Sequence, residues 1–187
     1  MDLSGKIALV TGASRGIGEA LAIGLAEHGT DVIICDLESE SKGLANTRKQ
    51  IEKTGKKCWS YFLDVTKKSQ IKKMVSDVLS DIGSIDILVN NAGILTPTSL
   101  EEIDEETWDN HFEVNTKGVL LMCQSVLPHM REKKSGRIIN IASIAGRQGS
   151  PTQGHYASTK SAVITLTRVL AQEVGEAGIT VNAICPG

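Results

Sequence analysis

The sequence of 187 residues has no apolar run long enough to cross a membrane and no excess of charge of either sign. A membrane-spanning helix needs about 18 or more consecutive apolar residues, and no stretch approaches that length. Acidic residues number 22 and basic residues 20, so no bulk charge attracts the chain to nucleic acid or to a membrane surface. The first residues also lack the apolar stretch of a secretory signal peptide. We therefore expect a cytoplasmic protein whose partners include neither nucleic acid nor membrane.

Cysteines with the spacing of metal ligands are absent too. The four cysteines are Cys35, Cys58, Cys123 and Cys185, and no two of them are separated as metal ligands are. All lie in strand-like or helix-like runs, so we interpret them as reduced core residues and expect no metal site. Linkers, internal repeats and low-complexity segments are lacking as well. The length suits one domain with a substantial core, spanning residues 1–187.

Short apolar runs alternate with longer amphipathic segments along the chain. The runs are continuous rather than alternating with polar residues, which is typical of parallel strands buried on both faces. We expect strands at residues 7–10, 32–35, 59–63, 85–89, 138–141 and 179–184. We expect helices at residues 19–28, 42–53, 70–82, 107–130 and 156–174. This order predicts an α/β fold of the three-layer αβα Rossmann type, a doubly wound parallel sheet that binds ligands at the carboxyl edge of its strands.

A glycine-rich turn follows the first expected strand. It reads Thr11-Gly12-Ala13-Ser14-Arg15-Gly16-Ile17-Gly18, with the spacing G-x-x-x-G-x-G. Glycine lets the backbone approach a pyrophosphate, and the N-terminus of the next helix points free N–H groups at phosphates. Such a turn alone is weak evidence, because it can be no more than a tight turn. Its position between a strand and a helix favours a dinucleotide site.

Two aspartates come directly after later strands. Asp36 follows Gly18 at close to the offset of about 20 residues that is typical of the acid binding the ribose hydroxyls of a dinucleotide. The alternative for Asp36 is an ordinary helix cap. Asp64 follows the third strand in the same way, and for Asp64 a capping role before Thr66 is an equally good explanation.

A tyrosine, a lysine and a serine suggest the chemistry. Tyr156 and Lys160 stand four positions apart in an expected helix, so they share one face. Ser143 follows the fifth strand at the ligand-binding edge, although a turn residue is the alternative explanation for it. An ammonium about 5 Å from a phenol favours the phenolate by roughly 3 kcal/mol at an effective dielectric of about 20. Tyr156 can then exchange a proton with an alcohol or carbonyl oxygen that the Ser143 hydroxyl holds.

Taken together, these residues resemble the short-chain dehydrogenase/reductase family over the whole chain. The matching motifs, in order, are Thr11 to Gly18, Asp64-Val65, Asn90-Asn91-Ala92-Gly93, Asn115, Ser143, Tyr156 with Lys160, and Pro186-Gly187. The resemblance implies hydride transfer between NAD(P) and an alcohol or ketone carbon.

The resemblance also assigns individual roles. It implies a catalytic tetrad of Asn115, Ser143, Tyr156 and Lys160, in which Asn115 holds a water and Lys160 also binds the nicotinamide ribose. The cofactor-binding residues it implies are Gly12, Ser14, Arg15, Gly16, Ile17, Gly18, Asp36, Asp64, Val65, Asn90, Asn91, Ala92, Gly93, Tyr156, Lys160, Pro186 and Gly187. Among these, Asn90, Ala92 and Gly93 line the adenosine side and Pro186-Gly187 borders the nicotinamide.

One departure from the family concerns the C-terminus. Members usually continue past the Pro-Gly motif into a substrate loop, further helices and a last strand, whereas this sequence stops at Gly187. We therefore expect a single dinucleotide-binding and catalytic domain that lacks those parts. The family also pairs the helices at 107–130 and 156–174 between subunits, and both carry apolar residues on more than one face, so we expect a homo-oligomer, a dimer or a tetramer.

The substrate class remains open between two subfamilies, the 3-oxoacyl-carrier-protein reductases and the sugar or polyol dehydrogenases. Gln172 stands before Glu173-Val174 where carrier-protein reductases often have arginine, which weakens the first assignment. The loop from Ile144 to His155 contains Arg147, Gln148, Gln153 and His155, and its polarity suits a hydroxylated substrate.

The cofactor prediction depends on two residues with opposite preferences. Arg15 is the kind of residue that binds the 2′-phosphate of NADP, whereas a carboxylate at Asp36 accepts a hydrogen bond from the ribose hydroxyl of NAD and repels a phosphate. We expect NAD to be preferred, with NADP possible. The alternative functions are a non-catalytic dinucleotide-binding regulator, which has no need for Tyr156 beside Ser143, and a structural or interaction fragment.

Overall fold

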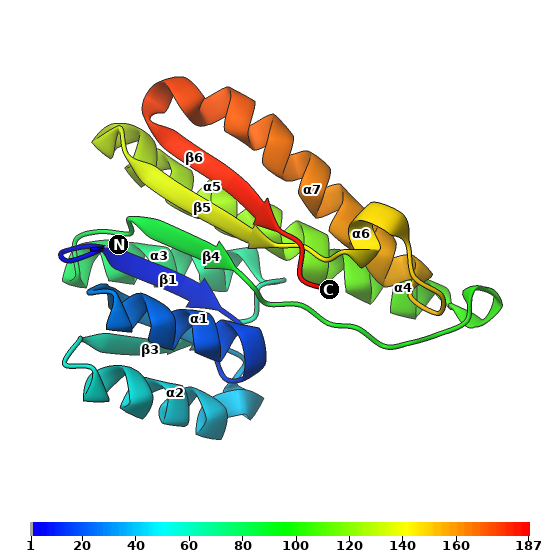
Figure 1. Ribbon diagram of the computed structural model, residues 1–187, viewed down its shortest axis with the longest axis horizontal. Helices are drawn as coiled ribbons and strands as arrows, with labels where there is room; N and C mark the ends of the chain where they lie inside the picture. The colour runs from blue at the N-terminus through cyan, green and yellow to red at the C-terminus, as the bar shows by residue number, and fades with distance from the viewer. Residues whose placement is uncertain (1) are drawn as a thin grey trace.

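Six parallel strands form one sheet in the computed structural model, which describes residues 2–187 (Figure 1). The strands are β1 (Ile7–Thr11), β2 (Asp31–Asp36), β3 (Cys58–Phe62), β4 (Ile87–Asn90), β5 (Gly136–Ile141) and β6 (Ile179–Ile184). Their order across the sheet is β3-β2-β1-β4-β5-β6, and every neighbouring pair is parallel. The chain therefore reverses direction across the sheet between β1 and β4, the arrangement that opens a crevice at the carboxyl edge.

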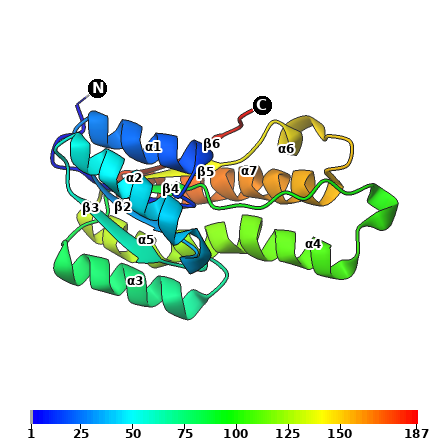
Figure 2. The same ribbon diagram turned by 90° about the horizontal axis from the view of Figure 1, so that it is seen from below.

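Helices cover both faces of this sheet. They are α1 (Gly16–Glu27), α2 (Ser41–Lys53), α3 (Lys68–Asp81), α4 (Glu105–Phe112), α5 (Gly118–Lys133), α6 (Ala145–Gln148) and α7 (Gly154–Val174). Figure 2 shows α1 and α3 on opposite sides of the strands. The three-layer αβα Rossmann fold predicted from the sequence is confirmed.

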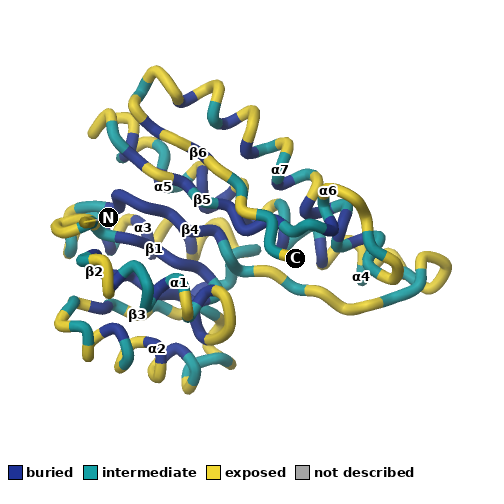
Figure 3. The backbone as a smooth tube through the Cα atoms, in the orientation of Figure 1, coloured by how far each residue is buried: buried dark blue, intermediate teal, exposed yellow. Residues whose placement is uncertain are grey.

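The hydrophobic core consists of two buried clusters, one on each face of the sheet, because side chains alternate between the faces along β1. Leu9 belongs to a buried cluster that includes side chains of α3, α5 and α7. Its neighbours Ala8 and Val10 point the other way, into a cluster with side chains of α1 and α2. Figure 3 shows β1 and β4 buried at the centre of the molecule. A strand buried on both faces has to be apolar throughout, which explains the continuous runs in the sequence.

The edge strands differ from that expectation. On β3 only Cys58 is fully buried, and on β6 Ile179 and Val181 are buried while Thr180 and Asn182 are exposed. Each edge strand thus packs on one face. Among the cysteines, Cys185 is likewise only partly buried, whereas the other three are buried as expected.

The residues of the predicted helix at 107–130 are helical throughout, but they do not form one regular α-helix. They are divided into α4, a π-helical turn at Glu113–Lys117, and α5. The helix α4 begins after Asp104, whose carboxylate accepts a hydrogen bond of 2.7 Å from the Thr107 N–H and so caps it. The wider π turn carries Asn115 to the inside of the molecule. Periodicity alone did not reveal this turn, because apolar residues continue on both sides of it.

Within residues 2–187, no helix combines the length and the apolar character that a membrane crossing requires. The same residues contain no group of three or more His, Cys, Asp or Glu side chains placed to hold a metal ion.

Candidate functional site

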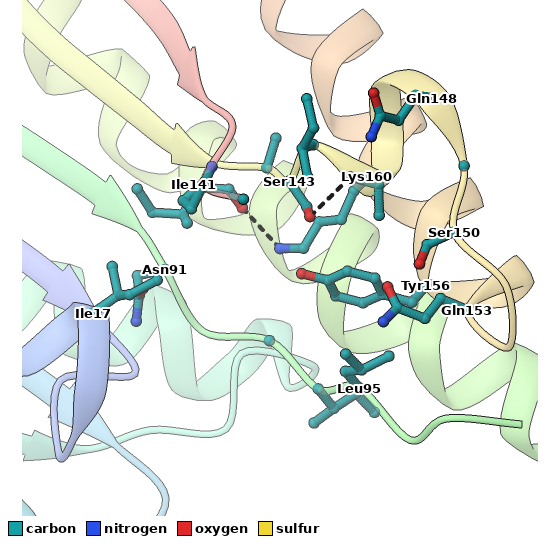
Figure 4. A pocket seen from close by; sticks show the side chains of 18 residues that line it. Ile17, Asn91, Leu95, Ile141, Ser143, Gln148, Ser150, Gln153, Tyr156 and Lys160 are labelled. Atoms are coloured by element: carbon teal, nitrogen blue, oxygen red, sulfur yellow. Dashed lines mark hydrogen bonds between the residues drawn. The ribbon is translucent and has the colours of Figure 1, made fainter.

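Two cavities adjoin at the carboxyl edge of the sheet. The first has a volume of about 450 Å³ and is lined by the glycine-rich turn, Asp36 and residues 91–94. The second has a volume of about 470 Å³ and is lined by residues 141–145, Tyr156 and Lys160 (Figure 4). Both are bordered by Ile17, Asn91, Gly93 and Ile94. The sheet thus brings the predicted cofactor residues and the predicted catalytic residues to one edge.

The glycine-rich turn leads from β1 into α1 and forms one wall of the first cavity. Gly16 has a φ of +59°, which favours glycine, and a side chain there would extend into open space beside the cavity. Gly18 lies so close to the residues that follow β1 and β4 that a side chain would collide with the Gly12 carbonyl and with the Asn91 side-chain amide. The turn therefore exposes backbone to the cavity at Gly16 and lets α1 pack against the sheet at Gly18.

The N-terminus of α1 opens toward this cavity. Arg15 occupies the cap position and no side chain accepts a hydrogen bond from the first turn of the helix. The free N–H groups and the positive end of the helix dipole together favour an anion such as a pyrophosphate. The turn and the helix therefore fit the phosphates of a dinucleotide.

Asp36 is fixed beside the turn. Its carboxylate accepts hydrogen bonds from the Ser14 N–H, at 3.0 Å, and from the Leu37 N–H, at 2.9 Å. It caps no helix, because the helical turn that follows has Leu37 at its cap position and no capping side chain. The helix-cap alternative for Asp36 is therefore wrong, and its carboxylate stands in the wall of the first cavity.

Asp64 forms a local turn rather than a helix cap, since α3 has Lys67 at its cap position and no capping side chain. Its side chain accepts hydrogen bonds from the Thr66 N–H, at 2.9 Å, and from the Thr66 hydroxyl, at 2.7 Å. Asp64 and Val65 nevertheless line the first cavity. The residue thus shapes the β3–α3 loop that borders this cavity.

Within the Asn-Asn-Ala-Gly motif, Asn90 and Asn91 face in different directions. Asn91 donates hydrogen bonds from its amide to the carbonyls of Thr11, at 3.1 Å, and Gly12, at 2.9 Å, and so braces the glycine-rich turn from β4. Asn90 is buried and donates to Asn140 Oδ1 at 2.9 Å. The expectation that Asn90 lines the adenosine side is therefore wrong, whereas Asn91 and its two successors do line the first cavity.

The second cavity gathers Ser143, Tyr156 and Lys160. Figure 4 shows the Tyr156 hydroxyl and the Lys160 ammonium pointing into the same part of it, beside Ser143. The Lys160 nitrogen lies 5.6 Å from the centre of the Tyr156 ring and donates a hydrogen bond of 2.7 Å to the Ile141 carbonyl. The Ser143 hydroxyl accepts from the Ala145 N–H at 3.2 Å, which orients it.

Lys160 is deeply buried for a lysine, with 4% of its surface exposed. Burial lowers its pKa to about 8, because the ammonium loses hydration there. The hydrogen bond that the ammonium donates to the Ile141 carbonyl replaces part of the hydration that it loses. The group is therefore still largely charged at neutral pH, close to the point where it titrates.

Asn115 lies behind the cavity wall. It is fully buried, and its amide exchanges hydrogen bonds with the backbone of Ile94, at 2.8 Å and 2.9 Å, and donates one to Thr159 Oγ1 at 3.1 Å. A side chain added at Gly93 would lie 3.1 Å from Asn115 Oδ1 and 3.5 Å from Lys160 Nζ. Asn115 and Lys160 therefore face the same small space, and Asn115 also holds the segment that forms the cavity wall.

Only some of the polar side chains in the loop from Ile144 to His155 line the second cavity. Gln148 and Gln153 line it, and so do Pro186 and Gly187 at the end of the chain. His155 does not, because it is fully buried and packs edge-on against His111 with ring centres 4.1 Å apart. The expectation that His155 contributes polarity toward a substrate is therefore wrong.

Two contributors escaped sequence reasoning. Ile141 acts through its backbone carbonyl, which no side-chain pattern reveals. Glu40 lines the first cavity from the turn after β2, where it forms an ion pair of 3.3 Å with Arg15. A signal for Glu40 was available in the acidic cluster Glu38-Ser39-Glu40 next to Asp36.

The sheet order, the glycine-rich turn at the carboxyl edge, and the serine, tyrosine and lysine in the adjoining cavity define an α/β protein of the Rossmann class. The family described as short chain dehydrogenase matches residues 6–187. The chain belongs to this family and is an oxidoreductase that acts on CH–OH groups.

Relatives and solved structures agree with this family. The 3-oxoacyl-[acyl-carrier-protein] reductase FabG of Staphylococcus epidermidis is 43% identical over 182 residues, which are 97% of this chain and 74% of that protein. FabG of Thermotoga maritima is 41% identical over 187 residues, 100% of this chain and 75% of that protein. A crystal structure of NAD+-bound xylitol dehydrogenase superposes with a TM-score of 0.96 at 34% identity, and covers 100% of this chain and 72% of that one.

Proposed function

We propose that the protein transfers a hydride between NAD(P) and a secondary alcohol or ketone, with Tyr156 exchanging the proton of the reacting oxygen. The observation that carries this proposal is the meeting of Ser143, Tyr156 and Lys160 in a cavity that adjoins the glycine-rich turn. A protein that only bound a dinucleotide would have no need of a phenol, an ammonium and a hydroxyl in that place.

The first cavity is the proposed cofactor site. The backbone at Gly16 and the N-terminus of α1 bind the pyrophosphate, and Asp36 accepts hydrogen bonds from the adenosine ribose. Asp64, Val65, Ala92 and Gly93 border the adenosine, and Pro186-Gly187 borders the nicotinamide. A nicotinamide dinucleotide bound here supplies or takes the hydride, and the protein positions the carbon that exchanges it.

The second cavity is the proposed site of proton transfer. The Ser143 hydroxyl donates a hydrogen bond to the substrate oxygen and holds it near the Tyr156 hydroxyl. In the oxidation direction Tyr156 takes the alcohol proton, and in reduction it returns that proton to the carbonyl oxygen. The positive charge of Lys160 stabilises the phenolate form, and Asn115, which faces the same space, completes the path of the proton toward solvent.

Two substrate classes are proposed, in order. The first is a 3-oxoacyl thioester, which the FabG relatives support at 40–43% identity. The second is a sugar or polyol, which Gln148 and Gln153 favour because they place polar side chains in the second cavity. The xylitol dehydrogenase structure supports the second class as well. In both cases the reacting group is a secondary alcohol or its ketone.

A substrate panel tests the proposal. The protein is assayed with NADH, NADPH and their oxidised forms against a 3-oxoacyl thioester, such as acetoacetyl-coenzyme A, and against linear polyols and their ketoses. Turnover of the thioester selects the first class and turnover of polyols the second. Quenching of protein fluorescence by the cofactor, with turnover of neither class, would point instead to a dinucleotide-binding regulator.

A further inference from the structure

The ion pair between Arg15 and Glu40 stands at the edge of the first cavity, beside Asp36. One guanidinium nitrogen of Arg15 lies 3.3 Å from one carboxylate oxygen of Glu40 and 3.4 Å from the other. The Arg15 side chain is 79% exposed and that of Glu40 31% exposed. Arg15, the basic residue that suits a 2′-phosphate, is thus already paired with the carboxylate of Glu40.

Glu40 is held in this place by the backbone. It ends the short 3-10 turn Glu38–Glu40, in which its N–H donates a hydrogen bond of 2.9 Å to the Leu37 carbonyl. The helix α2 begins directly afterwards and is tied to the glycine-rich turn, because Thr47 Oγ1 donates to the Ala13 carbonyl at 2.9 Å. Glu40 therefore faces Arg15 because of where α2 starts.

We propose that Glu40 is a second determinant of cofactor choice, which acts by neutralising Arg15 and so disfavours the 2′-phosphate of NADP. The inference rests on the proposed function, in which the first cavity binds a nicotinamide dinucleotide. Asp36 acts directly, as an acceptor for a ribose hydroxyl, whereas Glu40 acts through another side chain.

The charges at this edge give the direction of the effect. Two carboxylates, Asp36 and Glu40, stand against the single positive charge of Arg15, so the local sum is negative and repels a phosphate. Replacing Glu40 by the uncharged glutamine brings the sum to neutral and frees the guanidinium for bidentate contact with a phosphate. NAD carries a hydroxyl at that position and has no charge there to gain or lose. An exposed ion pair contributes little to stability, so the substitution should leave the fold intact.

Equilibrium binding tests the proposal without depending on turnover. Dissociation constants for NADH and NADPH are measured by cofactor fluorescence for the wild type and for Glu40→Gln. The matched control is Glu38→Gln, which removes an exposed acid from the same 3-10 turn but from outside the cavity. Glu40→Gln should bind NADPH about three- to fivefold more tightly, as expected for one exposed ion pair, and should bind NADH within about twofold of the wild type. Glu38→Gln should change neither constant.

A second variant separates the proposed route from a general change of surface charge. In an Arg15→Ala background, Glu40→Gln should bring a clearly smaller gain for NADPH than in the wild type, because only the direct repulsion between Glu40 and the phosphate is then relieved and no guanidinium is freed. An equal gain in both backgrounds, an equal gain for Glu38→Gln, or no gain at all would overturn the proposal. A wild type that bound neither cofactor would instead refute the dinucleotide site on which the proposal rests.

Discussion

The Lys160 ammonium lies 5.6 Å from the centre of the Tyr156 ring, and it donates its hydrogen bond to the Ile141 carbonyl at the end of β5. The lysine is thus anchored on the sheet, while the tyrosine is presented one helical turn earlier on α7. This geometry brings a fixed positive charge close to the phenol without using the phenol as its anchor. Under the proposed mechanism, the Tyr156 hydroxyl is then available to exchange a proton with a substrate.

The first prediction concerns Tyr156→Phe, which keeps the ring but removes the exchangeable proton. Loss of a positioned acid or base should lower kcat by about 100-fold or more, while the dissociation constant for the cofactor stays near the wild-type value. The other tyrosine of the chain provides the control, since Tyr61→Phe on β3 should leave kcat unchanged. A Tyr156→Phe variant that retains more than about a tenth of the wild-type kcat would contradict the assigned role.

Lys160→Met is expected to lose turnover and also to weaken cofactor binding. The reason is that Lys160 has two proposed tasks, one toward the Tyr156 phenol and one toward the nicotinamide ribose. Steady-state kinetics and fluorescence titration measure the two losses separately. If the variant lost turnover but bound the cofactor with unchanged affinity, the contact with the ribose would have to be abandoned.

Stability should depend on pH through the same lysine. Burial lowers the pKa of Lys160 to about 8, from the 10.5 of a free lysine, so between these values the unfolded chain binds the proton that the folded chain has released. Unfolding then takes up a proton, and the free energy of unfolding rises with pH across that window. Melting temperatures of the wild type and of Lys160→Met are measured from pH 7 to pH 10.5. The melting temperature of the wild type should rise relative to that of the variant across this range, because only the wild type has the buried lysine. Parallel curves for the two proteins would show that the lysine is not buried as described.

Cofactor preference should favour NAD, because the Asp36 carboxylate is fixed by Ser14 and Leu37 at the edge of the first cavity. Repulsion between this carboxylate and a 2′-phosphate should make kcat/KM with NAD at least about tenfold higher than with NADP. Asp36→Ala should lose most of that preference for NAD. The preference that remains should be due to Glu40, the second determinant proposed above. A wild-type preference for NADP would show that Arg15 outweighs the carboxylates.

The last prediction concerns assembly. Val169 on α7 is 46% exposed and Leu120 on α5 is 37% exposed, so both of the helices expected to pair between subunits present apolar side chains to solvent. Light scattering at micromolar concentration should give the mass of a dimer or a tetramer. Val169→Lys should shift that mass downward, whereas Leu100→Lys, at an exposed residue outside both helices, should not. A monomeric mass for the wild type would refute the prediction.

The sequence predicted those parts of the site that depend on local spacing. The turn from Gly12 to Gly18 and the pair Tyr156 and Lys160 lie within single elements, so their residue types and offsets already determine which groups face the ligand edge. Asp36 was found because it ends a strand next to that turn. Asn115 came only from the family resemblance, because a buried asparagine in a helical stretch has no chemical signature of its own.

The remainder depends on contacts that are distant in sequence or belong to the backbone. The Ile141 carbonyl anchors Lys160, but this backbone contact cannot be predicted from the identity of the isoleucine side chain. The direction of His155 toward His111 is set by the packing of α7 on α4, which the pattern of the loop does not contain. Likewise, Asn90 and Asn91 are adjacent in the sequence, but Asn90 ends β4 with its side chain in the core, whereas Asn91 follows the strand and bonds the glycine-rich turn.

The two cavities have only Ile17, Asn91, Gly93 and Ile94 in common. Most of the other walls of the first come from the chain between β1 and α3, with Ala92 and Val114 added from later in the chain, and every other wall of the second comes from the chain after β4. If the proposed sites are right, substitutions at the glycine-rich turn and after β2 can alter the preference for the adenosine end of the cofactor without touching the walls of the second cavity that lie beyond those four residues.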